Sequence, residues 1–379
     1  MRAPILDTRL TIASFAGLLW LPLLVGILTH GPTVSETEQR SLAALPDFEL
    51  SAEAVARLPE ALEIYYDDRV GLRDWLIRAW AWLHMHGLGV SSSDKLIIGQ
   101  DGWLFFGHEN AVAQYRGLAR FEPSELDRWA DILEGRRRWL AERGIAYLLV
   151  LVPNKHRQYG QYMPASLPRA SEVSQLDQLV ERLGQDGSVP FLDLRVALDA
   201  AARETRVYHK TDTHWNDLGA YAAYRAILER LRELDPSLAP LPPIAVRPYT
   251  RTRPGMGLAR IVGLSRALPE ESFEVAVVEP RAELDPHRRR AVEDRTRRQL
   301  PFGRGTGDSR LPTAVVFRDS FGSALVPLLS ESFSRVVYVW ERDVDPRIVE
   351  AEAPDLVIQQ IAERFLDRPP RGIAYDMGR

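Results

Sequence analysis

Residues 313–322 read TAVVFRDSFG. The strand-like run TAVVF at 313–317 is followed by the polar residues Arg318, Asp319 and Ser320, after which the spacing becomes helical. A strand without polar alternation is typical of a parallel sheet that is covered on both faces. A serine at the turn between strand and helix would lie at the carboxyl end of the strand, where open α/β sheets place their functional sites. This stretch therefore indicates a fold class and, at Ser320, a candidate site.

Stretches on either side repeat the alternation of apolar strand and helix. The strand-like runs are AYLLVLV at 146–152, VPFLDL at 189–194, RVVYVW at 335–340 and DLVIQQI at 355–361. Helical patterns lie near 172–184, after Asn216 and after Phe321. This order predicts an α/β fold with a mostly parallel sheet and helices on both of its faces.

The chain before residue 146 has a different pattern. Apolar spacing is helical over residues 51–86, with a break near 67–71. Residues 95–106 are typical of a β-hairpin, since two apolar runs flank a Gly-containing turn. A long helix is predicted from Pro123 to about Arg143.

The N-terminus contains an uncharged apolar run, TIASFAGLLWLPLLVGILT at 11–29. As a helix it would span roughly 28 Å, close to the thickness of a bilayer's hydrocarbon core. Arg2 and Arg9 precede it, so we expect a cytoplasmic N-terminus and a periplasmic remainder. The predicted organisation is a cytoplasmic end and transmembrane signal anchor at 1–30, a tether at 31–50 and one domain at 51–379. A cleaved signal peptide and a soluble buried helix are the alternatives.

Composition and charge exclude several functional classes. The net charge of -4 and the pI near 6.1 argue against a nucleic-acid binder. Absence of cysteine excludes disulfides, thiolate catalysis and cysteine-ligated metal sites. The histidines show no metal-binding spacing, so no metal is predicted. Residues 281–310 are rich in charge and predict a surface insertion; the alternative is a basic arm that contacts an acidic polysaccharide or lipid headgroups.

Two short strings contain the residue types of a catalytic triad. Asp212 and His214 stand two apart in DTHWN, so in an extended segment both side chains face the same way. An acid beside an imidazole fixes its tautomer and stabilises the imidazolium. Asn216 is then placed to cap the helix that starts at Asp217. The alternative is a structural loop in which Trp215 packs and His214 is merely polar.

Ser320 in RDSFG would supply the nucleophile, and its own backbone N–H at a helix start can help stabilise an oxyanion. The alternative is that Asp319 or Ser320 only caps the helix. Together the two strings contain a nucleophile, a base and an orienting acid.

These strings resemble the alginate O-acetyltransferase AlgJ/AlgX-type family, whose members carry an SGNH-hydrolase-like domain. The resemblance covers roughly residues 35–367, and the Asp-x-His-Trp string followed by Asp-Ser-Phe is its most specific part. Ordinary SGNH hydrolases place the serine first, and the reversed order here is similar to this family's permuted arrangement. Supporting strings are Gln39-Arg40-Ser41-Leu42-Ala43, Tyr66-Asp67-Asp68-Arg69, Gly99-Gln100-Asp101-Gly102-Trp103, Val152-Pro153-Asn154-Lys155 and Pro354-Asp355-Leu356-Val357.

The resemblance implies a three-layer SGNH-hydrolase-like domain in the anchored, AlgJ-like form. It implies Ser320 as nucleophile, His214 as general base and Asp212 as orienting acid. Arg318 stands where SGNH enzymes usually carry glycine, and the remaining oxyanion-hole groups are unassigned. Candidates for substrate or oxyanion contacts are Asn154, Lys155, Tyr159 and Arg318.

The function that this resemblance implies is a periplasmic O-acetyltransferase that acetylates an exported polysaccharide through an acyl-serine. It needs no soluble cofactor, and a membrane protein of the MBOAT type would supply the acetyl groups. Two alternatives stay open: an SGNH-type carbohydrate acetylesterase, for which the same triad would serve, and a non-catalytic polysaccharide-binding subunit of an export complex.

Overall fold

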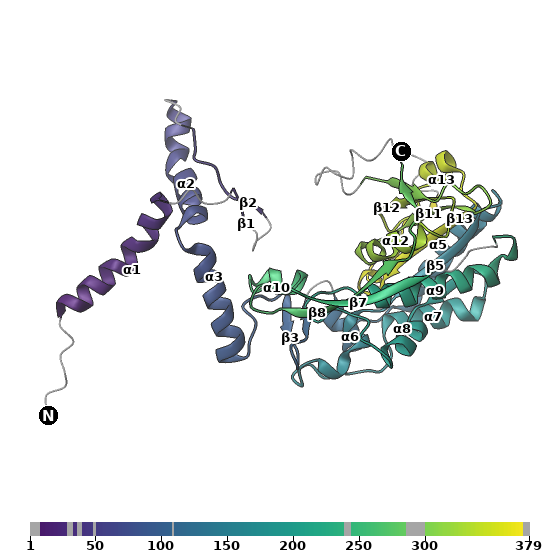
Figure 1. Cartoon of the computed structure of the whole chain (residues 1–379), viewed down its shortest axis with the longest axis horizontal. Helices are drawn as coiled ribbons and strands as arrows, with labels where there is room; N and C mark the ends of the chain where they lie inside the picture. Colours follow the sequence, from purple (N-terminus) through teal and green to yellow (C-terminus); the bar gives the residue numbers. More distant parts are fainter. Residues whose placement is uncertain are drawn as a thin grey trace. The chain divides into compact units, whose positions relative to one another are not determined.

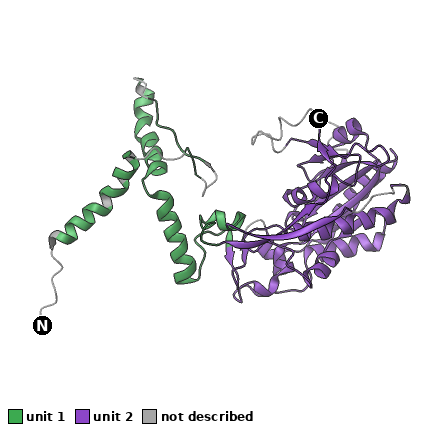
Figure 2. Cartoon of the chain, in the orientation of Figure 1, with its two compact units in different colours: residues 1–96, 255–268 green, residues 97–254, 269–379 purple. Residues whose placement is uncertain are grey.

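The computed structural model describes residues 8–28, 33–35, 40–47, 51–107, 110–238, 244–285 and 300–373. The chain divides into two compact units, coloured separately in Figure 2. Unit 1 comprises residues 1–96 and 255–268, and unit 2 comprises 97–254 and 269–379.

Unit 1 is mainly helical. Its elements are α1 (Thr8–Leu28), β1 (Val34–Ser35), β2 (Arg40–Ser41), α2 (Ala52–Arg69), α3 (Arg73–Trp82), the π-helix η1 (Leu83–Leu88) and α10 (Gly257–Ile261). The break predicted near residues 67–71 is confirmed, since α2 and α3 are separated by residues 70–72. Gly71 is needed there because a Cβ atom would lie 2.4 Å from the carbonyl oxygen of Pro22.

Among the helices of the described residues, none combines the length and hydropathy of a membrane span. The predicted anchor at 1–30 overlaps α1, and its residues 1–7 and 29–30 lie outside the described part. The anchor stays a prediction.

Unit 2 is built on a seven-stranded sheet (Figure 1) in the order β6-β5-β13-β11-β12-β10-β9. The strands are β5 (Ala146–Val152), β6 (Phe191–Asp193), β9 (Glu283–Leu284), β10 (Phe302–Gly305), β11 (Thr313–Phe317), β12 (Arg335–Val339) and β13 (Leu356–Ala362). Strands β6, β5, β13, β11 and β12 are parallel, whereas β10 and β9 are antiparallel to their neighbours. The mostly parallel sheet predicted from the apolar runs is confirmed.

Side chains alternate between the two faces of this sheet and bury a separate core on each. In β5, Leu148 and Val150 join one core, and Leu149 and Leu151 join the other. The first core is covered by α8 (Arg195–Ala202), α9 (Asp217–Leu234) and α12 (Val326–Leu329). The second is covered by α5 (Pro123–Ala141), α7 (Gln175–Asp186) and α13 (Pro346–Glu352). The three-layer architecture follows, because each face of an apolar sheet must be covered.

The remaining elements lie outside the central sheet; all belong to unit 2 except Leu96, the first residue of β3, which is the last residue of the 1–96 part of unit 1. They are the two-stranded sheet of β3 (Leu96–Ile98) and β4 (Leu104–Phe106), the antiparallel pair β7 (Val246–Arg253) and β8 (Glu270–Val277), the helices α4 (Ala111–Tyr115) and α6 (Lys155–Gln158), and the 3-10 turns η2 (Gly160–Tyr162), η3 (Pro236–Leu238), η6 (Ser320–Leu325) and η7 (Glu363–Phe365). The predicted hairpin at 95–106 is confirmed by β3 and β4.

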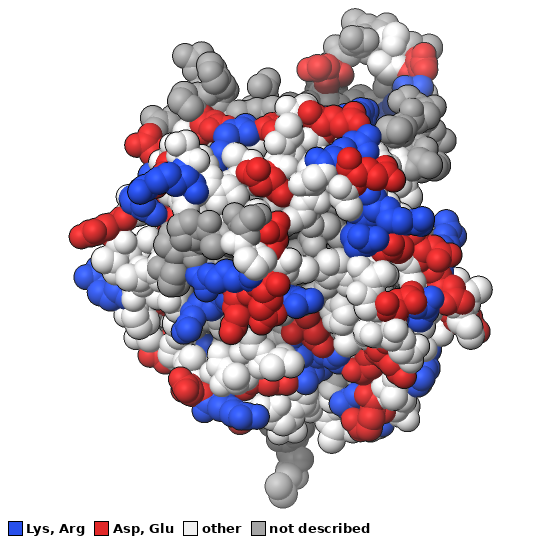
Figure 3. Space-filling view, turned by 90° about the vertical axis from the view of Figure 1, so that its right-hand side faces the viewer, with Lys and Arg blue, Asp and Glu red and all other residues white. Residues whose placement is uncertain are grey.

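The charged segment 281–310 begins and ends in the sheet rather than lying wholly on the surface. Its ends supply the edge strand β9 and its neighbour β10, which pair with each other. Residues 286–299, which hold most of its arginines, lie outside the described residues. Figure 3 shows basic and acidic side chains interspersed over one face of the molecule.

The strand order brings three loops together at the carboxyl edge of the sheet. The last strand, β13, lies between β5 and β11. The segments that leave these three parallel strands therefore start side by side; they begin at Pro153, Arg318 and Glu363. This edge contains Ser320.

Candidate active site

Asp212, His214 and Ser320 meet through two short hydrogen bonds. Nε2 of His214 lies 2.7 Å from Oγ of Ser320, and its Nδ1 lies 2.6 Å from Oδ1 of Asp212. The Asp212 side chain is 14% exposed and that of His214 is 32% exposed. An acidic group thus holds one imidazole nitrogen while the other is placed to accept the serine proton. Ser320 follows His214 by 106 positions and Asp212 by 108, and the fold brings the three residues together.

The loop that carries Asp212 and His214 is closed by backbone contacts at its base. Tyr208 and Trp215 form an isolated antiparallel bridge. Asn216 caps α9, as the sequence predicts, because its side chain accepts a hydrogen bond from the N–H of Gly219. Trp215 Nε1 donates to the carbonyl of Phe321 at 3.1 Å and so joins this loop to the serine loop.

Asp319 and Gln360 fix the serine loop. Asp319 accepts hydrogen bonds from the N–H of Phe321 and, through its other oxygen, from the N–H of Ala362. The Gln360 side chain accepts from the N–H groups of Asp319 and Gly322 and donates to the Asp319 carboxylate. The carboxylate of Asp319 therefore positions backbone, while Ser320 stays directed at the imidazole.

The N–H of Ser320 begins η6 and, as a first-turn donor, has no intrahelical acceptor. It belongs to the same residue as Ser320 Oγ, and it could help stabilise an oxyanion if that oxygen acted as a nucleophile. The following Gly322 packs closely: a Cβ atom there would lie 2.7 Å from the Arg318 side chain and 3.0 Å from Gln360 Oε1.

Lys155 lies beneath the Asp212 loop and is 1% exposed. Its Nζ donates to the carbonyl oxygens of His209 at 2.9 Å, Lys210 at 3.1 Å and Asp212 at 2.5 Å. These three acceptors match the three protons of an ammonium group. Lys155 is thus a positioning residue for the acid of the triad rather than a direct neighbour of Ser320.

We expect Lys155 to make the free energy of unfolding depend on pH between about pH 7 and pH 10. Burial lowers the pKa of Lys155 to about 7, below its usual 10.5. Between those values the unfolded chain binds a proton that the folded chain does not, so the free energy of unfolding should rise with pH. Denaturant titrations from pH 7 to pH 10 would measure the free energy of unfolding of the wild type and of Lys155→Met. The difference between the two values should rise with pH. A difference that stays flat or falls would contradict this expectation.

Glu270, at the start of β8, contacts the same loop. The buried carboxylate accepts from His209 Nδ1 at 2.9 Å, from the Thr211 N–H at 2.7 Å and from the Thr211 hydroxyl at 2.9 Å. Burial alone would raise the pKa of Glu270, but these hydrogen bonds outweigh it and the pKa lies below its usual value. Two buried groups of opposite charge, Lys155 and Glu270, therefore fix residues 209–212.

The other predicted contact residues bond elsewhere. Asn154 donates from Nδ2 to Gln114 at 3.0 Å, and the Tyr159 hydroxyl accepts from the N–H of Val207 at 2.8 Å. Arg318 donates to the carbonyl of Asp319 and to the Ser323 hydroxyl, and burial lowers its pKa to about 10. None of these hydrogen bonds reaches Ser320.

Sequence reasoning missed Glu270 and Gln360. Two adjacent glutamines in the apolar run DLVIQQI were a usable signal, because a buried amide in a core strand needs partners. Gln360 bonds the serine loop, and Gln359 bonds Arg136 on the opposite face. Glu270 gave no such signal. In the described part of the chain, no group of three or more potential metal ligands occurs.

The chain is similar to several known proteins. Residues 96–297 match the family model described as "SGNH hydrolase-like domain, acetyltransferase AlgX". The chain is 28% identical over 201 residues to the "Probable alginate O-acetylase AlgJ" of Pseudomonas aeruginosa, which covers 51% of this chain and 48% of that protein. This chain therefore spans about half the length of that relative.

Two further proteins are similar over a larger share. The protein of the same name from Azotobacter vinelandii is 25% identical over 343 residues, covering 85% of this chain and 81% of that one. The solved structure of Bacillus cereus PatB1 with a sulfonyl adduct has a TM-score of 0.52 at 12% identity, covering 73% of this chain and all of that one. The structural likeness supports the fold alone.

Proposed function

The chain belongs to the AlgX family of SGNH hydrolase-like acetyltransferase domains, and from this premise we propose that it is a serine-dependent O-acetyltransferase acting on hydroxyls of a polysaccharide. The observation that carries the proposal is His214, whose two ring nitrogens bridge Asp212 and Ser320. The relatives named alginate O-acetylase support an acetyl group and a polysaccharide as the two substrates.

In the first half-reaction, Ser320 Oγ attacks the carbonyl carbon of the acetyl donor while His214 Nε2 takes the hydroxyl proton. Asp212 stabilises the imidazolium that forms, and the Ser320 N–H stabilises the oxyanion. Collapse of the tetrahedral intermediate breaks the bond to the donor, whose leaving oxygen takes the proton back from His214. The product is acetyl-Ser320 with a neutral imidazole.

In the second half-reaction a sugar hydroxyl takes the place of the leaving group. His214 removes its proton as its oxygen attacks the acetyl-serine, and the proton then returns to Ser320 as the ester bond breaks. Transfer exceeds hydrolysis only if a bound polymer presents its hydroxyl at a higher effective concentration than water.

The test is how the acetyl group is divided between polymer and water. Full-length protein would receive a radiolabelled activated acetyl ester with and without a deacetylated polysaccharide. We expect label in the polymer fraction and none with Ser320→Ala. Ser320-dependent release of free acetate, with no label in any polymer, would indicate an esterase. Polymer binding without acetate chemistry would indicate the non-catalytic subunit.

The location and the donor belong to the same proposal. We propose that the apolar run at 11–29 anchors the chain in a bacterial inner membrane with unit 2 in the periplasm, and that an MBOAT-type protein supplies the acetyl group. Support comes from the uncharged run with Arg2 and Arg9 before it. Alkaline phosphatase fused after residue 379 should be active in cells, and an inactive fusion would contradict the orientation.

A further inference from the structure

Helix α3, in unit 1 (Figure 2), has an apolar face that is exposed. At about 100° per residue, five large apolar side chains fall within an arc of about 160°, and no charged residue of the described range 73–83 falls within it. The five are each between 46% and 59% exposed, and they are Trp75, Leu76, Trp80, Trp82 and Leu83. The other side of the helix faces inward, since Ala81 is buried and Ile77 is half-buried.

This pattern is the reverse of the one expected for a helix on the surface of a soluble domain. There the apolar side chains face the core and the charged side chains face water. Three tryptophans that are each about half exposed present on the order of 300 Å² of mostly apolar surface, a size at which a patch commonly marks an interaction site. The face therefore requires a partner that removes it from water.

Charged side chains border this face. In helical projection Arg73 lies about 20° beyond Trp80, at one edge. Arg78 is exposed and lies about 40° beyond Trp82, at the other edge. Asp74 lies nearly opposite the centre of the face. Cations at the edges of an aromatic and aliphatic face are typical of helices that lie in the headgroup region of a membrane, where the cations meet lipid phosphates.

The residues just before α3 pack against the apolar run at 11–29. The N–H of Gly71 donates to the carbonyl of Pro22 at 3.0 Å, and a Cβ atom on Gly26 would lie 2.8 Å from the carbonyl oxygen of Arg69. Pro22 and Gly26 precede the end of the run by a distance of roughly 5–10 Å along a helix. An interfacial helix buries its apolar face to a similar depth of about 5–10 Å. If the run spans the bilayer as proposed, this contact holds α3 at the depth of the headgroups.

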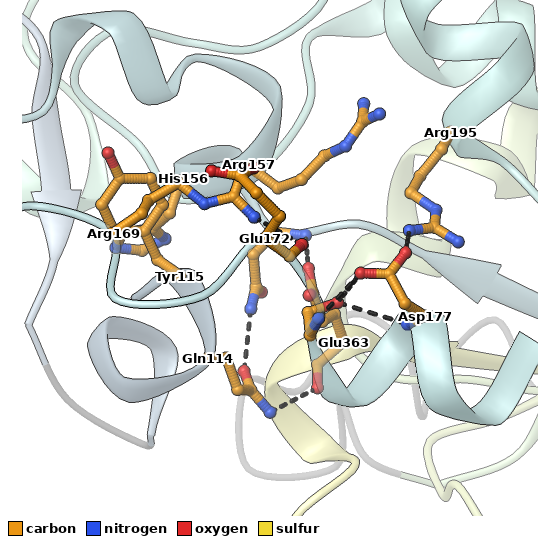
Figure 4. A pocket seen from close by; sticks show the side chains of 11 residues that line it. Gln114, Tyr115, His156, Arg157, Arg169, Glu172, Asp177, Arg195 and Glu363 are labelled. Carbon is orange, nitrogen blue, oxygen red and sulfur yellow. Dashed lines mark hydrogen bonds and ion pairs between the residues drawn. The ribbon is translucent and has the colours of Figure 1, made fainter. Parts of the chain in front are cut away.

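The cavity in unit 2 that Figure 4 shows has a different character. It encloses about 150 Å³ and is lined by charged and polar side chains, among which Arg195 points toward Asp177 and pairs with it. The exposed face of α3 offers only three indole N–H donors for side-chain hydrogen bonds, so a polysaccharide bound there would leave its hydroxyl groups unpaired. Indole rings suit an apolar layer whose edge is hydrated, as in a membrane interface.

We propose that α3 and Leu83 form an interfacial helix whose apolar face enters the headgroup region of a bilayer that contains anionic lipid. The three tryptophans lie at the boundary between headgroups and acyl chains, and Arg78 contacts lipid phosphate. The helix thus attaches unit 1 to the membrane surface in addition to the anchor. The inference rests on the membrane location proposed above, and it does not depend on the chemistry of Ser320.

Single labelled cysteines test this placement, because the chain contains no cysteine of its own. Full-length Leu76→Cys and Leu83→Cys, each carrying an NBD fluorophore, would be reconstituted into vesicles of phosphatidylethanolamine and phosphatidylglycerol. We expect lipids with a spin label near the headgroup to quench most of the emission at both positions, and aqueous iodide to quench little. Val196→Cys is the matched control, because Val196 is an exposed aliphatic residue in helix α8 of unit 2, and it should show the reverse.

Two outcomes would overturn the interfacial helix. Quenching by iodide at residues 76 and 83, without quenching by the spin-labelled lipid, would show that the face is in water. Protection from both quenchers would show that a protein surface, such as a second copy of the chain, covers the face instead of lipid.

A label in α1 distinguishes failure of this inference from failure of the proposed location. Leu18 is 74% exposed and lies near the middle of the apolar run, so lipids with a spin label deep in the acyl chain should quench Leu18→Cys if the run spans the bilayer. Lipid quenching at residue 18 alone would support the anchor and contradict the interfacial helix, and quenching at 76 and 83 alone would do the opposite. Acetylation of Ser320 by a small activated ester tests the transferase separately.

Discussion

Ser320→Ala and His214→Ala are each expected to lower the rate of acetyl transfer by on the order of 10⁶-fold, and the double variant is expected to lower it no further. The reason is that His214 acts only by moving the proton of Ser320, with which it shares a 2.7 Å contact. If either residue is removed, this proton transfer cannot occur, so removal of the other has no further effect. Initial rates with a chromogenic acetyl ester would measure the three variants.

Ser323→Ala is the matched control for this series. Ser323 lies in the same 3-10 turn as Ser320 but is exposed, so its variant should retain wild-type rates. Multiplicative losses in the double variant would mean that the two residues act independently. Such a result would argue against a shared proton transfer.

Glu270→Leu is expected to lower the free energy of unfolding by about 3–5 kcal/mol, because it removes the acceptor of three buried donors and one of the two carboxylates, with Asp212, that stabilise the charge of Lys155. Those donors belong to His209 and Thr211, which precede the acid of the triad. We therefore expect kcat for the surviving folded protein to fall as well. Denaturant unfolding and ester kinetics on the same samples would measure both effects.

The control for Glu270 is its neighbour in the same strand. Glu271 is exposed, so Glu271→Leu should change stability by no more than about 0.5 kcal/mol. A similar loss for both variants would show that β8 tolerates no leucine there. Full stability of Glu270→Leu would contradict the supporting role assigned to Glu270.

The strands of the central sheet could be predicted because a strand that is buried on both faces appears in the sequence as a run of consecutive apolar residues. Residues 146–152 and 313–317 form β5 and β11 with the boundaries predicted for them. The pair β7 and β8 was missed. Most of β7 is exposed and it contains Pro248, so neither alternation nor an apolar run identifies it.

The segment after Phe321 was predicted to be helical, and it is; most of it is the 3-10 turn η6 rather than an α-helix, followed by the short α12. The physical reason is local. The Asp319 carboxylate accepts from the N–H of Phe321, two residues later, and this contact tightens the turn. Apolar spacing does not record such a contact.

The proximity of Asp212, His214 and Ser320 was predictable because they lie in two short strings that contain the residue types of a triad. The residues that hold these three in place were not. Lys155 meets the loop at 209–212 across more than 50 positions, and Glu270 meets it across about 60, as their hydrogen bonds show. Only the folded chain brings a buried lysine and a buried glutamate to the same loop.

If Ser320 carries the acetyl group, as we propose, intact mass spectrometry of the full-length protein will detect the acetylated serine directly. The protein would be mixed with an activated acetyl ester, quenched in acid within seconds and digested for peptide mapping. We expect one added acetyl group on Ser320, absent from Ser320→Ala and lost when the polysaccharide acceptor is added before quenching. An acetyl group on another residue, or ester turnover that continues in Ser320→Ala, would contradict this proposal.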